Sequence, residues 1–281
     1  MNCLLYTSLH QRAAHDRGVR PAPLGQYEEG MSVPQRVARY GLIGTPLSHS
    51  FSQRYFTAKF KREKLANHRY DLFPLDDIRA LPALIAETPG LCGLNVTIPH
   101  KQSVMALLHE VDPLASAVGA VNTIRIADGR LAGFNTDVEG FRKTLVPLLD
   151  GAKPRALVLG SGGASRAVVY VLKELGIRFR VVSRSRENGD MTYELLEPII
   201  ADVCKLIINT TPVGMHPNED GLPPIPYGSI GPKHTLIDLV YNPERTRFLQ
   251  EGEARGAAIA NGLGMLEAQA EASWRLWNEE A

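Results

Sequence analysis

Short apolar runs alternate along this chain with segments of helical spacing. Leu91 to Ile98 and Arg155 to Leu159 are largely apolar, as strands are when both faces of a parallel sheet are covered. Gln53 to Lys64 instead carries apolar residues three and four positions apart, as an amphipathic helix does. The alternation predicts an α/β fold.

The same two patterns give a full set of expected elements. Asp128-Gly129 predicts a hairpin turn between two strands, the first beginning near residue 119 and the second ending at residue 134. The other expected strands are 39–44, 69–75, 91–98, 155–159, 178–182, 205–209, the apolar run from 235 and 257–260. The expected helices are 53–64, 76–87, one starting at Pro99, 112–118, 138–149, 166–175, 244–255 and 262–279.

The length of 281 residues predicts two domains. Residues 1–38 mix Pro, Gly, His and charged residues without a period, and we expect a disordered leader there. We expect a substrate domain at 39–136 together with 262–281, and a Rossmann-like dinucleotide-binding domain at 137–261, joined across a cleft.

Charge and cysteine content exclude several classes of protein. The formal net charge is +1, which gives no electrostatic reason to expect nucleic acid or a membrane surface as a partner. No apolar run approaches the roughly 20 residues that span a bilayer. The widely spaced Cys3, Cys92 and Cys204 form neither a metal pattern nor a disulfide framework, which favours a reducing cytoplasm.

Polar side chains gather where the run from Leu91 ends. Asn95, Thr97 and Lys101 follow one another there, and the carboxyl ends of strands are where α/β folds bind ligands. Pro99 suits the first position of a following helix. These side chains are therefore candidates for binding one small molecule. The alternative is a capped helix with a solvated lysine.

Further polar groups extend this set. Ser50 and Ser52 alternate around Phe51, so both hydroxyls can face one carboxylate; the alternative is that Ser52 caps the next helix. Asn122 and Asp137 lie at two other strand ends, and helix capping is the alternative for Asp137.

A glycine-rich turn separates the strand at 155–159 from a helix. The residues are Gly160, Ser161, Gly162, Gly163 and Ala164, in the strand–turn–helix context of a dinucleotide fingerprint. About 20 residues later, the next strand ends in Ser183, Arg184, Ser185 and Arg186. Two guanidinium groups suit the 2′-phosphate of NADP. The alternative is a solvated basic turn.

From about Tyr40 to its end the chain resembles the shikimate dehydrogenase family. The blocks that carry this resemblance are His49 to Ser52, Asn95 to Lys101, Gly119 to Thr123, Asn135 to Asp137, the Gly160 turn, Tyr241 to Pro243 and Gly262 to Gln269. The resemblance implies that Ser50 and Ser52 bind the shikimate carboxylate. It further implies that ring hydroxyls are bound by Asn95, Thr97, Asn122, Asp137 and Gln269, that Lys101 and Asp137 are the catalytic pair, and that Tyr241, Gly262 and Met265 lie near substrate or nicotinamide. We also expect Thr210, at the end of the strand 205–209, to contact the cofactor.

The implied activity is reversible reduction of 3-dehydroshikimate to shikimate with NADPH, by a cytoplasmic monomer or homodimer without a metal. The segment between Arg186 and Lys205 is short for this family, so we expect its usual helix to be lost or trimmed. Two alternatives remain: a dehydrogenase that also accepts quinate and uses NAD, and a non-catalytic sensor that keeps the ligand site.

Overall fold

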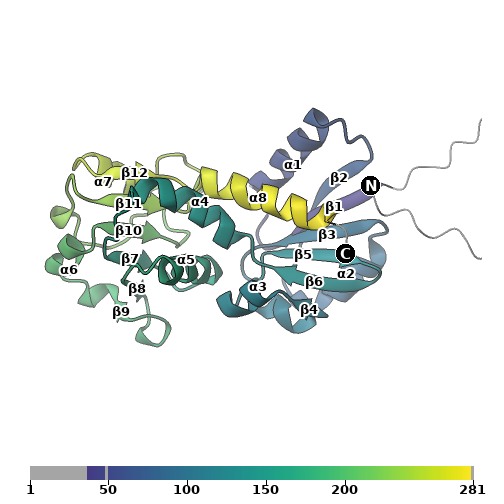
Figure 1. The fold of residues 1–281 in the computed structure, drawn as a ribbon, viewed down its shortest axis with the longest axis horizontal. Coiled ribbons are helices and arrows are strands. Elements are labelled where there is room, and N and C mark those ends of the chain that lie inside the picture. The colour runs from purple at the N-terminus through teal and green to yellow at the C-terminus, as the bar shows by residue number, and fades with distance from the viewer. Residues whose placement is uncertain (1–36, 48–49, 280–281) are drawn as a thin grey trace, which may run out of the picture.

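The computed structural model describes residues 37–47 and 50–279. Its helices and strands form two α/β lobes, each built on a six-stranded sheet (Figure 1). The long helix α8 (Leu263–Asn278) extends from one lobe to the other and packs along α4 (Asp137–Leu149). All but the last two residues of the expected leader lie outside the described residues, as does His49.

The N-terminal sheet has the strand order β2-β1-β3-β5-β6-β4. Strands β1 to β3 are parallel, β5 runs antiparallel to its neighbours, and Ala127 pairs with Arg130 across the hairpin that Asp128-Gly129 predicted. The strands are β1 (Ala38–Gly44), β2 (His68–Pro74), β3 (Leu91–Val96), β4 (Glu110–Val111), β5 (Thr123–Ala127) and β6 (Arg130–Phe134). The helices are α1 (Phe51–Arg62), η1 (Ile78–Ala80), α2 (Leu81–Glu87), η2 (Ser103–Leu107) and α3 (Pro113–Val118).

The second sheet is entirely parallel, in the order β12-β11-β10-β7-β8-β9. The chain passes from β7 to β8 on one side and later returns to β10 on the other. The strand order therefore reverses at β7, where doubly wound folds bind ligands. The strands are β7 (Ala156–Leu159), β8 (Phe179–Ser183), β9 (Met191–Thr192), β10 (Leu206–Asn209), β11 (Thr235–Asp238) and β12 (Ala258–Ala260). The helices are α5 (Gly163–Glu174), η3 (Arg186–Asn188), η4 (Tyr193–Leu195), α6 (Pro198–Val203), η5 (Tyr227–Ser229) and α7 (Arg247–Glu253).

Each sheet is covered on both faces by buried apolar side chains, as the near-continuous apolar strands predicted. On one face of the N-terminal sheet, Leu94 of β3 and Ile124 of β5 belong to a buried apolar cluster. The cluster on the other face consists largely of aromatic rings, which include Phe56 and Trp277. Trp277 comes from α8, so the end of the chain completes the core of the first lobe.

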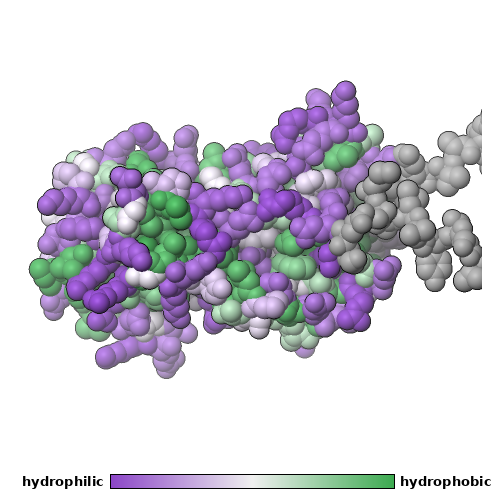
Figure 2. Space-filling model, in the orientation of Figure 1, coloured by the Kyte–Doolittle hydropathy of each residue, from purple (hydrophilic) through white to green (hydrophobic). Residues whose placement is uncertain are grey.

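The outer surface mixes polar and apolar side chains. Figure 2 shows hydrophilic residues over most of one face of the molecule, with smaller apolar patches between them. Large apolar side chains that stay exposed include Val146 and Leu148 of α4 and Ile199 of α6. Scattered exposure of this kind is normal for a protein surface and calls for no partner to cover it.

The helix expected from Pro99 is wrong. The peptide between Ile98 and Pro99 is cis, and residues 98–102 form turns that lead into the short 3₁₀ helix η2. Between Arg186 and β10 the structure has the short elements η3, β9 and η4 and the six-residue helix α6, and the expectation that the family's usual helix is trimmed stays a prediction. The exact domain boundaries stay a prediction.

Candidate active site at the junction of the lobes

Lys101 and Asp137 form an ion pair where the two lobes meet. The distance from Lys101 Nζ to Asp137 Oδ2 is 2.6 Å, and the two side chains are only 16% and 7% exposed. Asn122 donates from Nδ2 to the other oxygen of Asp137, Oδ1, at 2.9 Å. Both carboxylate oxygens are thus occupied, which fixes the plane of the carboxylate and the position of the ammonium.

Two alternatives for these residues are wrong. Lys101 is not a solvated surface lysine, since its ammonium is paired and mostly covered. Asp137 does not cap the following helix, because α4 begins at Asp137 itself and Thr136 occupies the N-cap position. The carboxylate is still in the first turn of α4, where the helix dipole favours a negative charge.

The lysine also contacts the glycine-rich turn of the second lobe. A Cβ atom added at Gly163 would lie 3.0 Å from Lys101 Cβ and 3.1 Å from its Cδ. Glycine is thus the residue that lets the start of α5 approach the lysine so closely. The candidate catalytic pair and the candidate cofactor loop are therefore direct neighbours.

A buried network of polar side chains surrounds Asn122, the residue that donates to Asp137. Asn122 accepts a hydrogen bond from the Thr136 backbone N–H at 2.7 Å, and its Nδ2 lies 3.4 Å from Gln269 Oε1. The hydroxyls of Thr123, Thr136 and Ser273 lie 2.8 to 3.2 Å from one another. These three residues were not among the sequence candidates. The only signal for Ser273 is its position four residues after Gln269, on the same face of α8.

Asn95 belongs to this network as well. It is only 4% exposed; its Oδ1 accepts from the Tyr70 hydroxyl at 2.8 Å, and its Nδ2 donates to Ser273 at 2.9 Å. Burial raises the pKa of Tyr70, which keeps this hydroxyl protonated as a donor. Both ends of the Asn95 amide are therefore engaged within the protein.

The hydroxyl pair at the start of α1 has a different setting. Ser50 is the N-cap residue, but its side chain makes no capping hydrogen bond, and Ser52 lies inside the helix, so the alternative that Ser52 is the cap is wrong. The Phe51 N–H donates to the Tyr241 hydroxyl at 3.4 Å, and the two rings meet edge to face with centroids 5.6 Å apart. Tyr241 follows β11, so the second lobe reaches the first at this point. Thr97 lies half-buried beside β1, and its backbone N–H donates to Ile43 O.

The glycine-rich turn presents backbone to the crevice at the end of β7. Gly160 has φ +102°, in the left-handed region, and Thr210 packs against it while donating to the Leu159 carbonyl at 2.7 Å. Helix α5 begins at Gly163, three residues earlier than expected, with Gly162 as its N-cap. The turn residues Ser161 to Ala164 therefore stand at a helix N-terminus, which favours an anion.

The basic turn after β8 divides into a buried hydroxyl and exposed cations. Ser183 is buried; its hydroxyl donates to the Ser185 carbonyl and accepts from the Ser185 N–H, so it shapes the turn. Arg184 and Arg186 are exposed, and neither takes part in an ion pair with any described residue. Their guanidinium groups are available to a phosphate.

The remaining predicted site residues lie at the start of α8. A Cβ at Gly262 would clash with the Leu239 carbonyl oxygen, so only glycine fits there. Met265 is buried in the core that α4 and α5 share, and Gln269, one turn later, lies beside Asn122. The structure thus brings Lys101, Asp137, Asn122, Gln269 and Gly163 together, whereas the Met265 side chain belongs to the core.

Comparisons with known proteins decide the family. A profile of the shikimate dehydrogenase substrate binding domain matches residues 42–124. Shikimate dehydrogenase (NADP(+)) from Methanopyrus kandleri is 38% identical over 272 residues, which cover 89% of this chain and 93% of that protein. The chain belongs to the shikimate dehydrogenase family.

Solved structures agree with this family assignment. The shikimate 5-dehydrogenase of Thermus thermophilus, in complex with NADP(H) and shikimate, has a TM-score of 0.74 and 34% identity, covering 86% of this chain and 93% of that one. Quinate dehydrogenase from Corynebacterium glutamicum, in complex with NAD, has a TM-score of 0.77 and 27% identity, covering 86% and 94%. The fold is thus shared by shikimate and quinate dehydrogenases.

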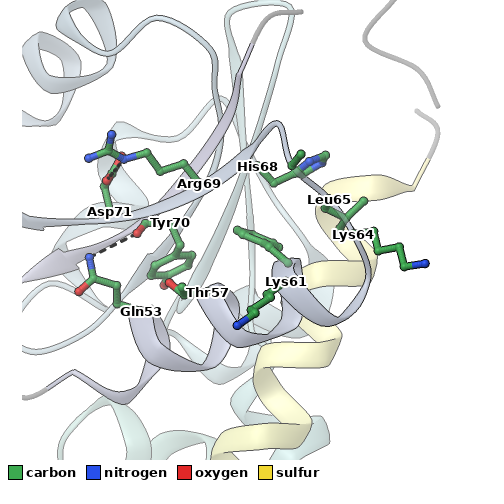
Figure 3. A pocket seen from close by; sticks show the side chains of 11 residues that line it. Gln53, Thr57, Lys61, Lys64, Leu65, His68, Arg69, Tyr70 and Asp71 are labelled. Carbon is green, nitrogen blue, oxygen red and sulfur yellow. Dashed lines mark hydrogen bonds and ion pairs between the residues drawn. The ribbon is translucent and has the colours of Figure 1, made fainter.

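One further cavity lies away from the candidate catalytic and cofactor-binding residues. A groove of about 570 Å³ runs between α1 and β2, lined by residues that include Lys61, Lys64 and Arg69 (Figure 3). None of the candidate catalytic or cofactor-binding residues lines it. The described residues contain no cluster of potential metal ligands, and none of their helices is long and apolar enough to cross a membrane.

Proposed function

We propose that this chain catalyses the reversible, NADP-dependent interconversion of 3-dehydroshikimate and shikimate, as an oxidoreductase acting on a CH–OH group. The observation that carries the proposal is the Lys101–Asp137 ion pair, partly buried and in contact with Gly163 of the dinucleotide loop. A proton donor beside a cofactor loop is what reduction of a carbonyl requires. The family and its NADP(H)- and shikimate-bound member support the same assignment.

The residues of the second lobe fit NADP. A Cβ at Gly162 would meet no atom of the described residues within 4 Å, so the backbone at the start of α5 is open to a pyrophosphate. Arg184 and Arg186 are exposed at the end of β8, at the distance along the chain where a 2′-phosphate is bound. Two guanidinium groups there, neither in an ion pair with a described residue, favour NADP over NAD.

The bound nicotinamide supplies or accepts the hydride, and the chain's own groups manage the proton. Negative charge grows on the substrate oxygen as the carbonyl is reduced. We propose that the Lys101 ammonium stabilises that charge and donates a proton to the oxygen. Asp137 holds the ammonium, and Asn122 holds Asp137, so the donor needs no reorientation during the reaction.

The remaining polar groups suit a small polyhydroxylated acid. The hydroxyls of Ser50 and Ser52, at the N-terminal end of α1, are proposed to bind the carboxylate of the substrate. Asn95, Thr97, Asn122 and Gln269 are proposed to bind ring hydroxyls, and Asn95 would exchange one of its hydrogen bonds within the protein to do so. Tyr241 contacts the start of α1 from the second lobe, and we propose that this contact helps to exclude water when the lobes enclose the substrate.

The test is an absorbance assay of nicotinamide reduction with purified protein. Shikimate or quinate is mixed with NADP or NAD in the four combinations. We expect turnover with shikimate and NADP at a kcat/KM at least about tenfold above any other combination, since one well-made charge-assisted contact is worth at least that factor. Preference for quinate and NAD would favour the second dehydrogenase, whose fold the chain also shares. Shikimate binding without turnover would favour the sensor.

Two expectations from the sequence remain predictions. The cytoplasmic location was inferred from the spacing of the cysteines, and no disulfide joins the two that the structure describes, Cys92 and Cys204. A monomer or homodimer is expected, which analytical ultracentrifugation of the purified chain would establish.

A further inference from the structure

One face of α1 carries a stripe of side chains at four-residue intervals, and the stripe continues to the helix C-cap. Its members are Phe51, Tyr55, Lys59 and Glu63. Residues four apart lie above one another on a helix, so the stripe runs along the full length of α1. At its N-terminal end it meets Tyr241 of the second lobe, and in its middle it meets α8.

The contact with α8 is an ion pair whose cation is buried. Lys59 is only 4% exposed, and its ammonium lies 3.0 and 2.8 Å from the two carboxylate oxygens of Glu271 and 2.8 Å from Glu63 Oε1. The Tyr55 hydroxyl also donates to Glu271, and the Lys59 ammonium lies 5.6 Å from the centre of the Trp274 ring. Glu271 is thus held by two residues of one helix.

A pair of this kind contributes little to stability. Desolvation of a lysine offsets much of its attraction to a carboxylate, and apolar residues of similar volume stabilise a core at least as well. What such a pair does set is registry, because its hydrogen bonds are satisfied at one relative position of the two helices. Around it, α1 packs through aromatic rings such as Phe56 and Phe60, whose contacts are less directional.

The relative position of α1 and α8 affects the geometry of the proposed substrate site. Helix α1 begins at the hydroxyls proposed to bind the carboxylate, Ser50 and Ser52, and α8 presents Gln269 and Ser273 to the buried network below Asp137. Sliding or rotating α1 relative to α8 changes the distance between the carboxylate end and the ring-hydroxyl end of the site.

We propose that Lys59 and Glu271 are positioning residues that fix α1 against α8 and thereby set where the substrate carboxylate is bound. This inference rests on the proposed function. Neither residue is among those proposed to bind the substrate. Their loss should weaken substrate binding and leave the chemical step and the cofactor site nearly unchanged.

The first variant is Lys59→Met, which keeps most of the side-chain length. The Glu271 side chain is 36% exposed and keeps Tyr55 as a donor, so it stays hydrated when the ammonium is removed. We expect KM and the calorimetric Kd for shikimate to rise about tenfold, since small misplacements of binding groups cost factors of this size or more. kcat and KM for NADP should change less than about twofold.

The decisive variant is the double replacement Lys59→Met/Glu271→Leu. Apolar packing at both positions should return the melting temperature to the wild-type value or above it. If the pair sets registry, KM and Kd for shikimate stay raised in this stable protein. A return of both constants to wild-type values would overturn the inference, because the pair would then act through stability alone.

The matched control is Glu174→Gln, which breaks the ion pair between Arg142 of α4 and Glu174 of α5. It should leave KM for shikimate unchanged; a similar rise there would contradict a specific role for α1 and α8. Wild-type protein that binds shikimate without turnover would refute the proposed activity, and the Kd series would still test positioning. Wild-type protein that does not bind shikimate would overturn both.

Discussion

The candidate sites of the two lobes consist of different kinds of chemical group. In the N-terminal lobe the candidate site consists of buried side chains joined by hydrogen bonds, such as Asn95, Asn122 and Asp137. In the second lobe it consists of backbone at the start of α5 and of exposed guanidinium groups. A small ring with several hydroxyls demands fixed donors and acceptors, whereas the phosphates of a dinucleotide are recognised by helix termini and exposed cations.

Lys101 is the cation of the candidate site in the N-terminal lobe, and its removal should have the largest effect on activity. Lys101→Ala should lower kcat by roughly 100-fold or more with little change in shikimate binding, as loss of a general acid does. Lys143→Ala removes an exposed lysine paired with Glu139 on α4 and serves as the control in the same steady-state assay. Near-normal turnover of the Lys101 variant would refute the assigned role.

The cofactor side is tested by charge removal. In Arg184→Ala/Arg186→Ala, KM for NADP should rise about 10- to 100-fold while KM for NAD is nearly unchanged. One charge-assisted hydrogen bond to a phosphate is worth about 1.5–3 kcal/mol, and solvent screening of these exposed arginines reduces their joint contribution to about that of one such bond. Arg178→Ala, at the amino end of β8, is the control. Equal losses with both cofactors would mean that the turn recognises something other than the 2′-phosphate.

The contact between the lobes is tested at two neighbouring glycines. In Gly163→Ala the new Cβ lies 3.0 Å from Lys101 Cβ, so the lysine must shift by a few tenths of an ångström, and we expect kcat to fall about tenfold. In Gly162→Ala the new Cβ meets no protein atom, and only KM for NADP should respond. A fall in kcat of equal size in both variants would contradict a specific effect on the lysine.

The smallest effect on activity is expected at Asp238, which organises the second lobe. Its carboxylate accepts hydrogen bonds from Asn209, Val240 N–H and Thr246. Burial raises the pKa of Asp238 from its ordinary value to about 6, with these hydrogen bonds acting in the opposite direction. Between about pH 4 and pH 6 the native state therefore binds more protons at this group than the unfolded state does.

Stability should consequently fall as pH rises through that range, by about 2–3 kcal/mol for this group, and be level above it. Asp238→Asn cannot titrate, so its free energy of unfolding should lack this fall. Urea unfolding of both proteins at a series of pH values measures the difference. Parallel curves for the two proteins would show that Asp238 titrates at its ordinary pKa.

Much of the fold was predictable from local pattern. Buried parallel strands are apolar throughout, so β7, β10 and β11 were evident, and the glycine-rich turn was recognisable from its strand and helix context. The helix expected at Pro99 failed for a local reason. Proline suits the first turn of a helix and other turns alike, and residues 98–102 form turns instead of a helix.

Patterns along the sequence were enough to predict a two-domain α/β fold, the candidate residues at the strand ends and the loop that suits a dinucleotide. Tertiary structure alone decided how they are arranged: that Asn122 bonds to Asp137, that Gly163 touches Lys101, and that Lys59 is buried against Glu271. Hydrophobic periodicity reports which face of an element is buried, and it does so through neighbours along the chain. Hydrogen-bonded side chains that lie 15 to 212 residues apart produce no periodic pattern in the sequence, because their contact depends on how separate elements pack.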